Sequence, residues 1–414
     1  MRALRGVRRS LPLLLVPLAA CGSGETSDSS AFSVRDSAGI QIAESSAPAW
    51  KAGEEWTVGA EPTVEIGVVD GAPEYQLNRV TDARRQSSGQ IVVTNSASNE
   101  IRLYDASGRH LRTVGGRGGG PGEFQTLLYT KLLPGDSLIA FDLMPQRVSI
   151  FSPGGDFVRS FQLESGADGA FPFASGVLRD GSVIAYIPQS TGKQVDGLQR
   201  PSQLFLHYSR DGKMLDTVAV QPGPERFVQT QPGKNGTMSM SQIPPMFSHN
   251  PVQAVNNDRV VFGENESYEL AMYAPDGVVK RLVRRKVAPR PVTDADFASL
   301  LDTRLAGYSD AARRREMEST YRSLPRPDIM PFYDTVLFDD RANLWVREFQ
   351  PAATTPLPWT VFDPEGRMLG TVTLPDGLRT MQIGDDFVLG VWMDDLDVQH
   401  VRMYALTKPA RDPR

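Results

Sequence analysis

Six side chains of the kinds that recognise ligands each stand near the start of a short apolar run. They are Arg79, Tyr129, Phe173, His249, Tyr333 and Arg379. Aromatic rings and guanidinium groups around a concave mouth are typical of recognition surfaces. The six residues are far apart in the chain, so they form one binding site only if a repeated fold gathers the six runs. The alternative is that the aromatic rings pack in the core and the arginines are solvated.

Motifs of known catalytic centres do not accompany these residues. A phosphate loop needs Lys and Ser or Thr after its glycines, and the Gly-rich stretch 116–124 is not followed by them. Pro121 also stands where a dinucleotide-binding loop needs Gly. The sequence has no Gly-x-Ser-x-Gly nucleophile elbow and no His-Glu-x-x-His zinc motif. We therefore predict no cofactor, and we favour a binding protein over an enzyme.

The elements that must position these side chains repeat along the chain. Each repeat is an aromatic residue, a turn with Gly, and a strand that ends in Val or Phe. The copies are residues 104–114, 151–161, 208–218, 273–283 and 362–372. Pairs such as Asp-Gly at their centres suit tight turns, which need a positive φ. Each copy is predicted to be the hairpin between the last two strands of a unit.

Another pair of strands is predicted in each unit. Its second member is a short β-branched and apolar run, at 90–94, 137–141, 182–186, 259–262, 343–346 and 387–391. Such runs suit strands sandwiched between packed sheets. The sixth unit ends at 400–404 without an outer strand, which residues 55–58 or 63–66 can supply. The sequence thus predicts an all-β fold, a six-bladed β-propeller with four-stranded blades and a ring closed by an N-terminal strand.

One insertion breaks the strand pattern. Thr293 and Asp296 have the spacing of a capping box, and Phe297, Leu301 and Leu305 then share one face at helical spacing. We predict a small helical insertion at about 293–324, packed on the side or a face of the propeller.

The Gly-rich stretch carries a family resemblance. Gly-Arg-Gly-Gly-Gly-Pro-Gly-Glu-Phe at 116–124 resembles the linker between blades of the NHL family. The opening residues 33–42 resemble the start of six-bladed NHL-like propeller lipoproteins of bacteria. The resemblance covers residues 33–408 and leaves a C-terminal tail at 409–414. It implies a fold more than a function, because NHL-like propellers serve as binding platforms and, less often, as lyases or hydrolases.

The same resemblance leaves an enzymatic alternative open. Propeller hydrolases of the lactonase-like kind hold one Ca²⁺ with carboxylates and amides that converge on the axis. The matching candidates in this chain are Asn78, Asn250 and Asp334. Arg79 and Arg379 would repel a cation beside them. The alternative function is a metal-dependent lyase or lactonase-type hydrolase with an axial Ca²⁺ or Zn²⁺ site.

The N-terminus resembles a lipoprotein signal. Residues 1–20 combine four arginines with an apolar run too short to span a bilayer. The sequence Leu-Ala-Ala-Cys at 18–21 resembles the bacterial lipobox, whose Cys takes a diacylglyceryl group, and Cys21 is the sole Cys. Residues 21–32 would then be the lipidated Cys and a flexible tether. The alternative is an ordinary export signal.

The net charge of the chain without its signal bears on which classes of partner it can bind. Removal of the signal leaves 40 basic and 49 acidic residues, a net charge of −9, which argues against nucleic acid. An Asp directly after the lipidated Cys often retains lipoproteins at the inner membrane. Here that position is Gly22, so location at the outer membrane is favoured. We expect a monomer that touches the membrane only through its lipid. It would act as a binding or scaffold module for a peptide, glycan or protein partner.

Overall fold

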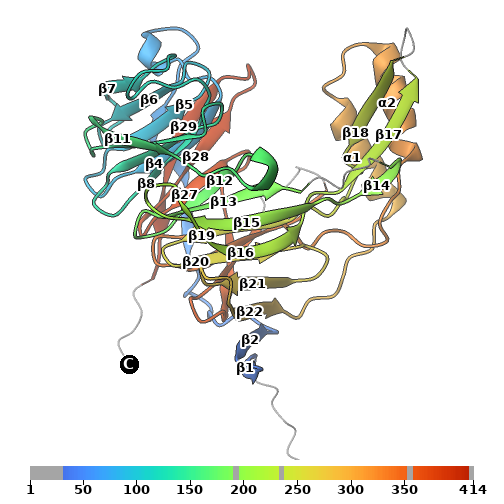
Figure 1. Ribbon diagram of the computed structural model, residues 1–414. Helices are drawn as coiled ribbons and strands as arrows, with labels where there is room; N and C mark the ends of the chain where they lie inside the picture. The colour runs from blue at the N-terminus through green and yellow to red at the C-terminus, as the bar shows by residue number, and fades with distance from the viewer. Residues whose placement is uncertain (1–30, 190–194, 233–236, 352–357, 410–414) are drawn as a thin grey trace, which may run out of the picture. The chain divides into compact units, whose positions relative to one another are not determined.

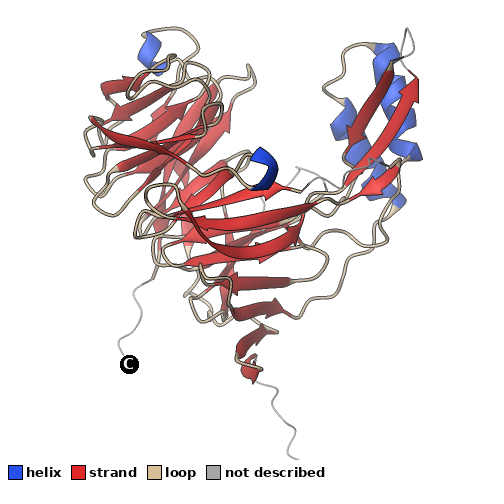
Figure 2. Cartoon of the chain, viewed as in Figure 1, coloured by secondary structure: helices blue, strands red, loops and turns tan. Residues whose placement is uncertain are grey.

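A computed structural model describes residues 31–189, 195–232, 237–351 and 358–409 (Figure 1). This part of the chain is built of β-strands apart from two α-helices and two 3₁₀ turns, Pro73–Tyr75 and Ala167–Gly169 (Figure 2). The prediction of an all-β class is therefore confirmed. The described residues include no helix that is both long and apolar enough to cross a membrane. The predicted signal peptide and Cys21 lie outside the described residues.

Most strands form four-stranded units in which chain neighbours pair antiparallel. The first three sheets are β4 (Val80–Arg85), β5 (Ile91–Asn95), β6 (Glu100–Tyr104) and β7 (His110–Gly115); β8 (Leu127–Leu132), β9 (Leu138–Asp142), β10 (Arg147–Phe151) and β11 (Phe157–Gln162); and β12 (Phe173–Val177), β13 (Val183–Pro188), β15 (Ser202–Tyr208) and β16 (Met214–Pro222). The next three are β19 (Val252–Asn256), β20 (Arg259–Gly263), β21 (Glu269–Tyr273) and β22 (Val279–Arg285); β23 (Tyr333–Phe338), β24 (Leu344–Glu348), β25 (Pro358–Phe362) and β26 (Met368–Thr373); and β27 (Arg379–Ile383), β28 (Phe387–Met393), β29 (Gln399–Thr407) and β3 (Thr57–Ile66). The fourth sheet gains two strands at its edge, β2 (Ile40–Ser45), which pairs parallel with β22, and β1 (Phe32–Ser37).

The repeated hairpins join the last two strands of five sheets, as predicted. Their turn glycines are left-handed, with φ from +82° to +89°, at Gly108, Gly155, Gly212, Gly277 and Gly366. In the first hairpin the Asp105 carboxylate accepts hydrogen bonds from the Ser107 hydroxyl and from the N–H of Arg109. These donors hold the pKa of Asp105 below its ordinary value.

The sixth sheet takes its last strand from the N-terminal part of the chain. Strand β3 pairs antiparallel with β29, from Thr57 opposite Thr407 to Ile66 opposite Val401. Both stretches that the sequence offers for this strand, 55–58 and 63–66, overlap β3. The pairing joins segments that are more than 330 residues apart, as the ion pair between Glu65 and Arg402 illustrates.

Apolar clusters lie between the sheets. Five clusters pack each sheet against the next along the chain. A sixth packs the last sheet against the first through Leu389, Val401, Ile91 and Val93. Burial of these side chains is the main source of stability, because the chain has no second Cys for a disulfide.

The helices fall inside the predicted insertion. Helix α1 (Asp294–Leu305) begins at the predicted capping box, in which Thr293 and Asp296 each bond the other's backbone N–H. Helix α2 is Ala311–Ser323. The helices bury Leu301 and other residues beside Phe227 and Ile243 from β17 (Arg226–Pro232) and β18 (Met238–Ile243). These strands form a separate three-stranded sheet with β14 (Gly197–Gln199), so the apolar faces of the helices are covered by a second insertion that the sequence pattern did not reveal.

Candidate functional site

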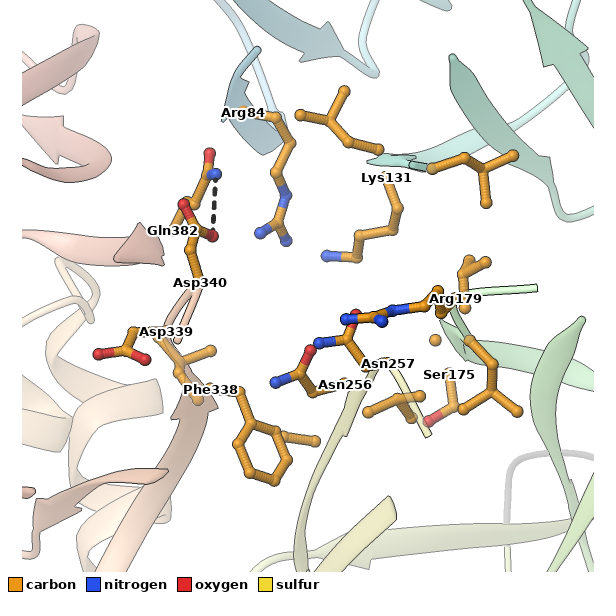
Figure 3. A pocket seen from close by; sticks show the side chains of 18 of the residues that line it. Arg84, Lys131, Ser175, Arg179, Asn256, Asn257, Phe338, Asp339, Asp340 and Gln382 are labelled. Carbon is orange, nitrogen blue, oxygen red and sulfur yellow. Dashed lines mark hydrogen bonds between the residues drawn. The ribbon is translucent and has the colours of Figure 1, made fainter. Parts of the chain in front are cut away.

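One cavity collects side chains from the first strand of each four-stranded unit, namely β4, β8, β12, β19, β23 and β27. Its volume is about 480 Å³. We call it the six-strand cavity. Its polar lining includes Arg84, Lys131, Ser175, Arg179, Gln253, Asn256, Asn257, Asp340 and Gln382 (Figure 3). A concave space of this size, with a few convergent polar groups, is the usual form of a small-molecule site.

A buried carboxylate holds two of the cations. Asp82 has a side chain only 2% exposed, and its oxygens lie 2.6 Å from Lys131 Nζ and 2.9 Å from Arg84 Nε. Asp82 and Arg84 are two positions apart on β4 and therefore project from the same side of the strand. Burial and the charge of Arg84 outweigh Asp82 and lower the pKa of Lys131 to about 8. One carboxylate therefore serves two cations, which leaves this part of the cavity positive.

A third cation lies close to them. The Arg179 side chain is exposed to the cavity, and among the described residues it makes no ion pair. Its backbone N–H donates to the Asn257 carbonyl over 2.7 Å, which joins the turn after β12 to the turn after β19. Figure 3 shows the Lys131 amine between the guanidinium groups of Arg84 and Arg179. Amide groups, including Asn256, continue the wall.

The wall also carries a carboxylate. The Asp340 side chain accepts a weak hydrogen bond from Gln382 Nε2 at 3.5 Å, while Gln382 Oε1 accepts from the Arg85 N–H at 2.7 Å. The concave surroundings displace bulk water from Asp340 and raise its pKa. The neighbouring Asp339 points away from the cavity (Figure 3), and its carboxylate accepts from Asn343 Nδ2 at 2.8 Å. Asp340 thus lies beside Arg84, whose charge lowers the pKa of Asp340 less than burial raises it, while Lys131 and Arg179 continue the wall beyond Arg84.

None of the six side chains predicted to form the binding site lines the six-strand cavity. Arg79 and Asn78 line a separate groove beside Gln399, and Arg379 lines another depression beside Trp359. Phe173 stacks on a neighbouring aromatic ring, Tyr186, at 5.4 Å between centroids. The structure therefore does not bring the predicted residues to one mouth.

The tyrosines serve packing, which is the alternative that the sequence left open. The prediction that Tyr333 lines a ligand site is wrong, because its side chain is 0% exposed in the core between the fourth and fifth sheets. Its hydroxyl donates to the Glu269 carbonyl at 2.7 Å and accepts from the Asn265 N–H. The Tyr129 hydroxyl donates to the Ala174 carbonyl of the next sheet. Burial raises the pKa of both phenols.

The remaining predicted residues have local partners. His249 lies 3.5 Å from Glu225, between Nδ1 and Oε1. The Asn250 amide donates to Ser248, and Asp334 forms an ion pair with Arg347 at 2.5 Å. In the described part of the chain, no group of three or more His, Cys, Asp or Glu side chains is placed to hold a metal ion. The alternative ligand set of Asn78, Asn250 and Asp334 is therefore not assembled in one of the cavities above.

The cavity lies at the other end of the strands from the predicted residues. The prediction took the residues where each first strand begins, whereas Arg84, Lys131 and Gln382 lie toward the strand ends. A signal for them was present: charged residues two positions apart in the first strand of a unit, as Asp82 and Arg84 are in β4. Such residues are rarely buried without a partner or a function.

Comparisons with known proteins give a distant likeness. No family model and no curated protein matches the sequence. A Bacteroides fragilis protein described as exported is 11% identical, with a TM-score of 0.47 over 89% of this chain and 99% of that one. A Bacteroides vulgatus member of the DUF4221 family is 10% identical, with a TM-score of 0.49 over 86% and 99%. A streptogramin B lyase is 11% identical, with a TM-score of 0.39 over 84% and 98%.

Proposed function

We propose that this chain is an exported, six-bladed β-propeller that binds a small anionic, hydroxylated ligand in the six-strand cavity. The apolar clusters between all consecutive sheets, including the last and the first, support a closed ring. Hydrogen bonds between first strands of neighbouring sheets support it too, such as Arg85 N–H to Gln382 on the sixth and first sheets. In this arrangement β3 closes the ring and the six-strand cavity lies on the axis.

The chemistry of the lining decides the class of ligand. Arg84, Lys131 and Arg179 lie together in the cavity wall, and Asp82 is shared by two of them, so this part of the cavity is positive and attracts an anion. The amide-rich wall offers donors and acceptors for hydroxyl groups. A space of about 480 Å³ suits one or two sugar rings and excludes a folded protein surface. Of a peptide, a glycan or a protein partner, the cavity therefore favours the acidic end of a glycan.

The free guanidinium of Arg179 is the single observation that carries this proposal, since no described residue neutralises it. Calorimetric titration of the chain with methyl glucuronide should give saturable binding, and methyl glucoside should bind at least tenfold more weakly. Arg179→Gln should weaken methyl glucuronide binding by roughly 10–100-fold, because a hydrogen bond to a charged group contributes about 1.5–3 kcal/mol.

A matched control is available on the helical insertion. Arg315 is also exposed and without an ion pair among the described residues, and it lies on α2, far along the chain from the cavity strands. Arg315→Gln should leave the affinity unchanged. Equal binding of the charged and neutral glycosides, or an Arg179→Gln affinity equal to that of wild type, would show that the cavity is not an anion site.

The proposed location of the protein in the cell rests on its N-terminal sequence. We propose that Cys21 is lipidated and that residues 21–32 tether a monomeric propeller to the cell envelope, at the outer membrane of a two-membrane cell. Cys21→Ser should move the protein from the membrane fraction to the soluble fraction. Retention of that variant in the membrane would refute the anchor.

The enzymatic alternative can be tested by measuring the metal content of the same purified protein. A stoichiometric Ca²⁺ or Zn²⁺, lost from Asn250→Ala or Asp334→Ala, would favour a metal-dependent lyase or lactonase over a binding protein. We expect neither variant to change the affinity for methyl glucuronide, because both residues lie outside the six-strand cavity.

A further inference from the structure

Lys131 combines three properties that few lysines share. Its amine points into a cavity, it lies beside the cations Arg84 and Arg179, and it touches the buried carboxylate of Asp82 at 2.6 Å. Lys408 is a useful comparison, because it is also largely buried and lies 3.7 Å from the Asp339 carboxylate. Lys408 lies outside the six-strand cavity, so it shares the burial of Lys131 but not its neighbours.

We propose that Lys131 captures the aldehyde or ketone carbonyl of an anionic ligand as an imine. The inference rests on the proposed binding function, and it names the ligand more closely as a carbonyl-bearing acid, such as the open-chain form of a sugar acid. Arg179 and Arg84 would hold the carboxylate of the ligand. The amine between them would then face the carbonyl carbon at short range, which is what makes a bound reaction fast.

The covalent step needs no oxidant and no reductant. The Lys131 ammonium gives a proton to Asp82, and the neutral amine nitrogen attacks the carbonyl carbon. The carbonyl oxygen takes the proton that Asp82 received, the attacking nitrogen gives one of its own protons to Asp82 in return, and a neutral carbinolamine results. Its hydroxyl leaves as water when the nitrogen lone pair forms the C=N bond, and Asp340 is the acid in the cavity wall that can protonate it. The products are the imine and one water molecule, and hydrolysis reverses the step.

The charged surroundings favour the neutral amine. Burial and the charge of Arg84 on β4 disfavour the ammonium form, whereas Asp82 on β4 favours it. Arg179, just after β12, is the other cation of the wall near the amine. With its pKa at about 8, Lys131 has roughly 200-fold more free amine near neutral pH than an ordinary lysine. The nearby Asp340 has a raised pKa and so keeps more of its acid form than an aspartate in bulk water.

The test uses glyoxylate, the smallest anionic aldehyde, with cyanoborohydride to trap imines as carboxymethyl-lysine. Peptide mass spectrometry of the full chain at pH 7.5 should find Lys131 modified roughly tenfold faster or more than the exposed Lys51, Lys213 and Lys280. Methyl glucuronide, which has no free carbonyl, should protect Lys131 by competition. Arg179→Gln should slow the labelling of Lys131 several-fold and leave the exposed lysines unaffected.

The outcomes separate this inference from the function it rests on. Methyl glucuronide binding without preferential labelling of Lys131 would overturn the imine and leave the anion site standing. Equal labelling of Lys131 and Lys408 would also overturn it, because burial alone would then explain the reactivity. Lys131→Arg keeps the positive charge, so it should abolish the adduct while methyl glucuronide still binds. Absence of both binding and labelling would remove the proposed function itself.

Discussion

Replacing Asp82 by Asn tests how the cavity holds its cations. The amide keeps the shape of the side chain but leaves Lys131 and Arg84 close together without their shared counter-charge. Removal of one partner from a buried ion pair costs about 3–5 kcal/mol. The side chains of Lys131 and Arg84 are 29% and 18% exposed, so cavity water relieves part of the repulsion. We expect Asp82→Asn to lower the free energy of unfolding by roughly 2–3 kcal/mol.

Urea unfolding at pH 7 measures this loss as a shift of the midpoint at constant slope. The double variant Asp82→Asn/Lys131→Met should recover at least about 1 kcal/mol over Asp82→Asn alone, because one of the two repelling cations is gone. A loss below about 0.5 kcal/mol in the single variant, or a double variant less stable than the single one, would refute the shared-carboxylate arrangement.

Three further variants test the fold and the site. Tyr333→Phe leaves the buried Glu269 carbonyl without its donor and should cost about 1–2 kcal/mol of unfolding free energy, seen as a lower thermal midpoint; an unchanged midpoint would contradict this. Thr293→Ala removes the capping box and should cost about 1 kcal/mol, with faster hydrogen exchange in α1 and unchanged exchange in the central strands. Between pH 8 and 10.5 the unfolded chain binds more protons at Lys131 than the folded chain does, so wild-type stability should rise over this window by up to roughly 3 kcal/mol relative to Lys131→Met. Parallel pH curves for the two proteins would show that the amine of Lys131 is not desolvated.

Most parts of the fold that the sequence predicts correctly depend on interactions between residues close together in the chain. The hairpin glycines specify a left-handed backbone, and only neighbouring residues are needed to recognise the turn, as at Gly108. The Thr293 cap is likewise local. Strand β3 is a non-local partner, but the sequence predicts it, because the sixth unit lacks a strand and residues 55–58 or 63–66 have the pattern of one.

The candidate site depends on contacts between side chains of different sheets, which short sequence patterns do not predict. Asp82 and Lys131 meet only because two different sheets pack at one register. The place of Tyr333 at the start of a strand predicts that it lies on a binding surface. It is instead buried, because Gly263 on the previous sheet leaves room for its ring: a Cβ there would stand 2.4 Å from the Tyr333 hydroxyl. Side-chain type therefore suggested function at a position where packing against a distant glycine decides the role.

The pairing of β3 with β29 also sets an order of events during synthesis. Strand β3 leaves the ribosome early, and its partner β29 is made more than 330 residues later. Until then β3 has no ladder to join, and the sixth sheet cannot form. Contacts between such distant segments form slowly, because the chain entropy of a long loop must first be overcome. For the export proposed above, this delay is useful, because a polypeptide that cannot complete its fold before its C-terminus is made stays unfolded enough to be translocated.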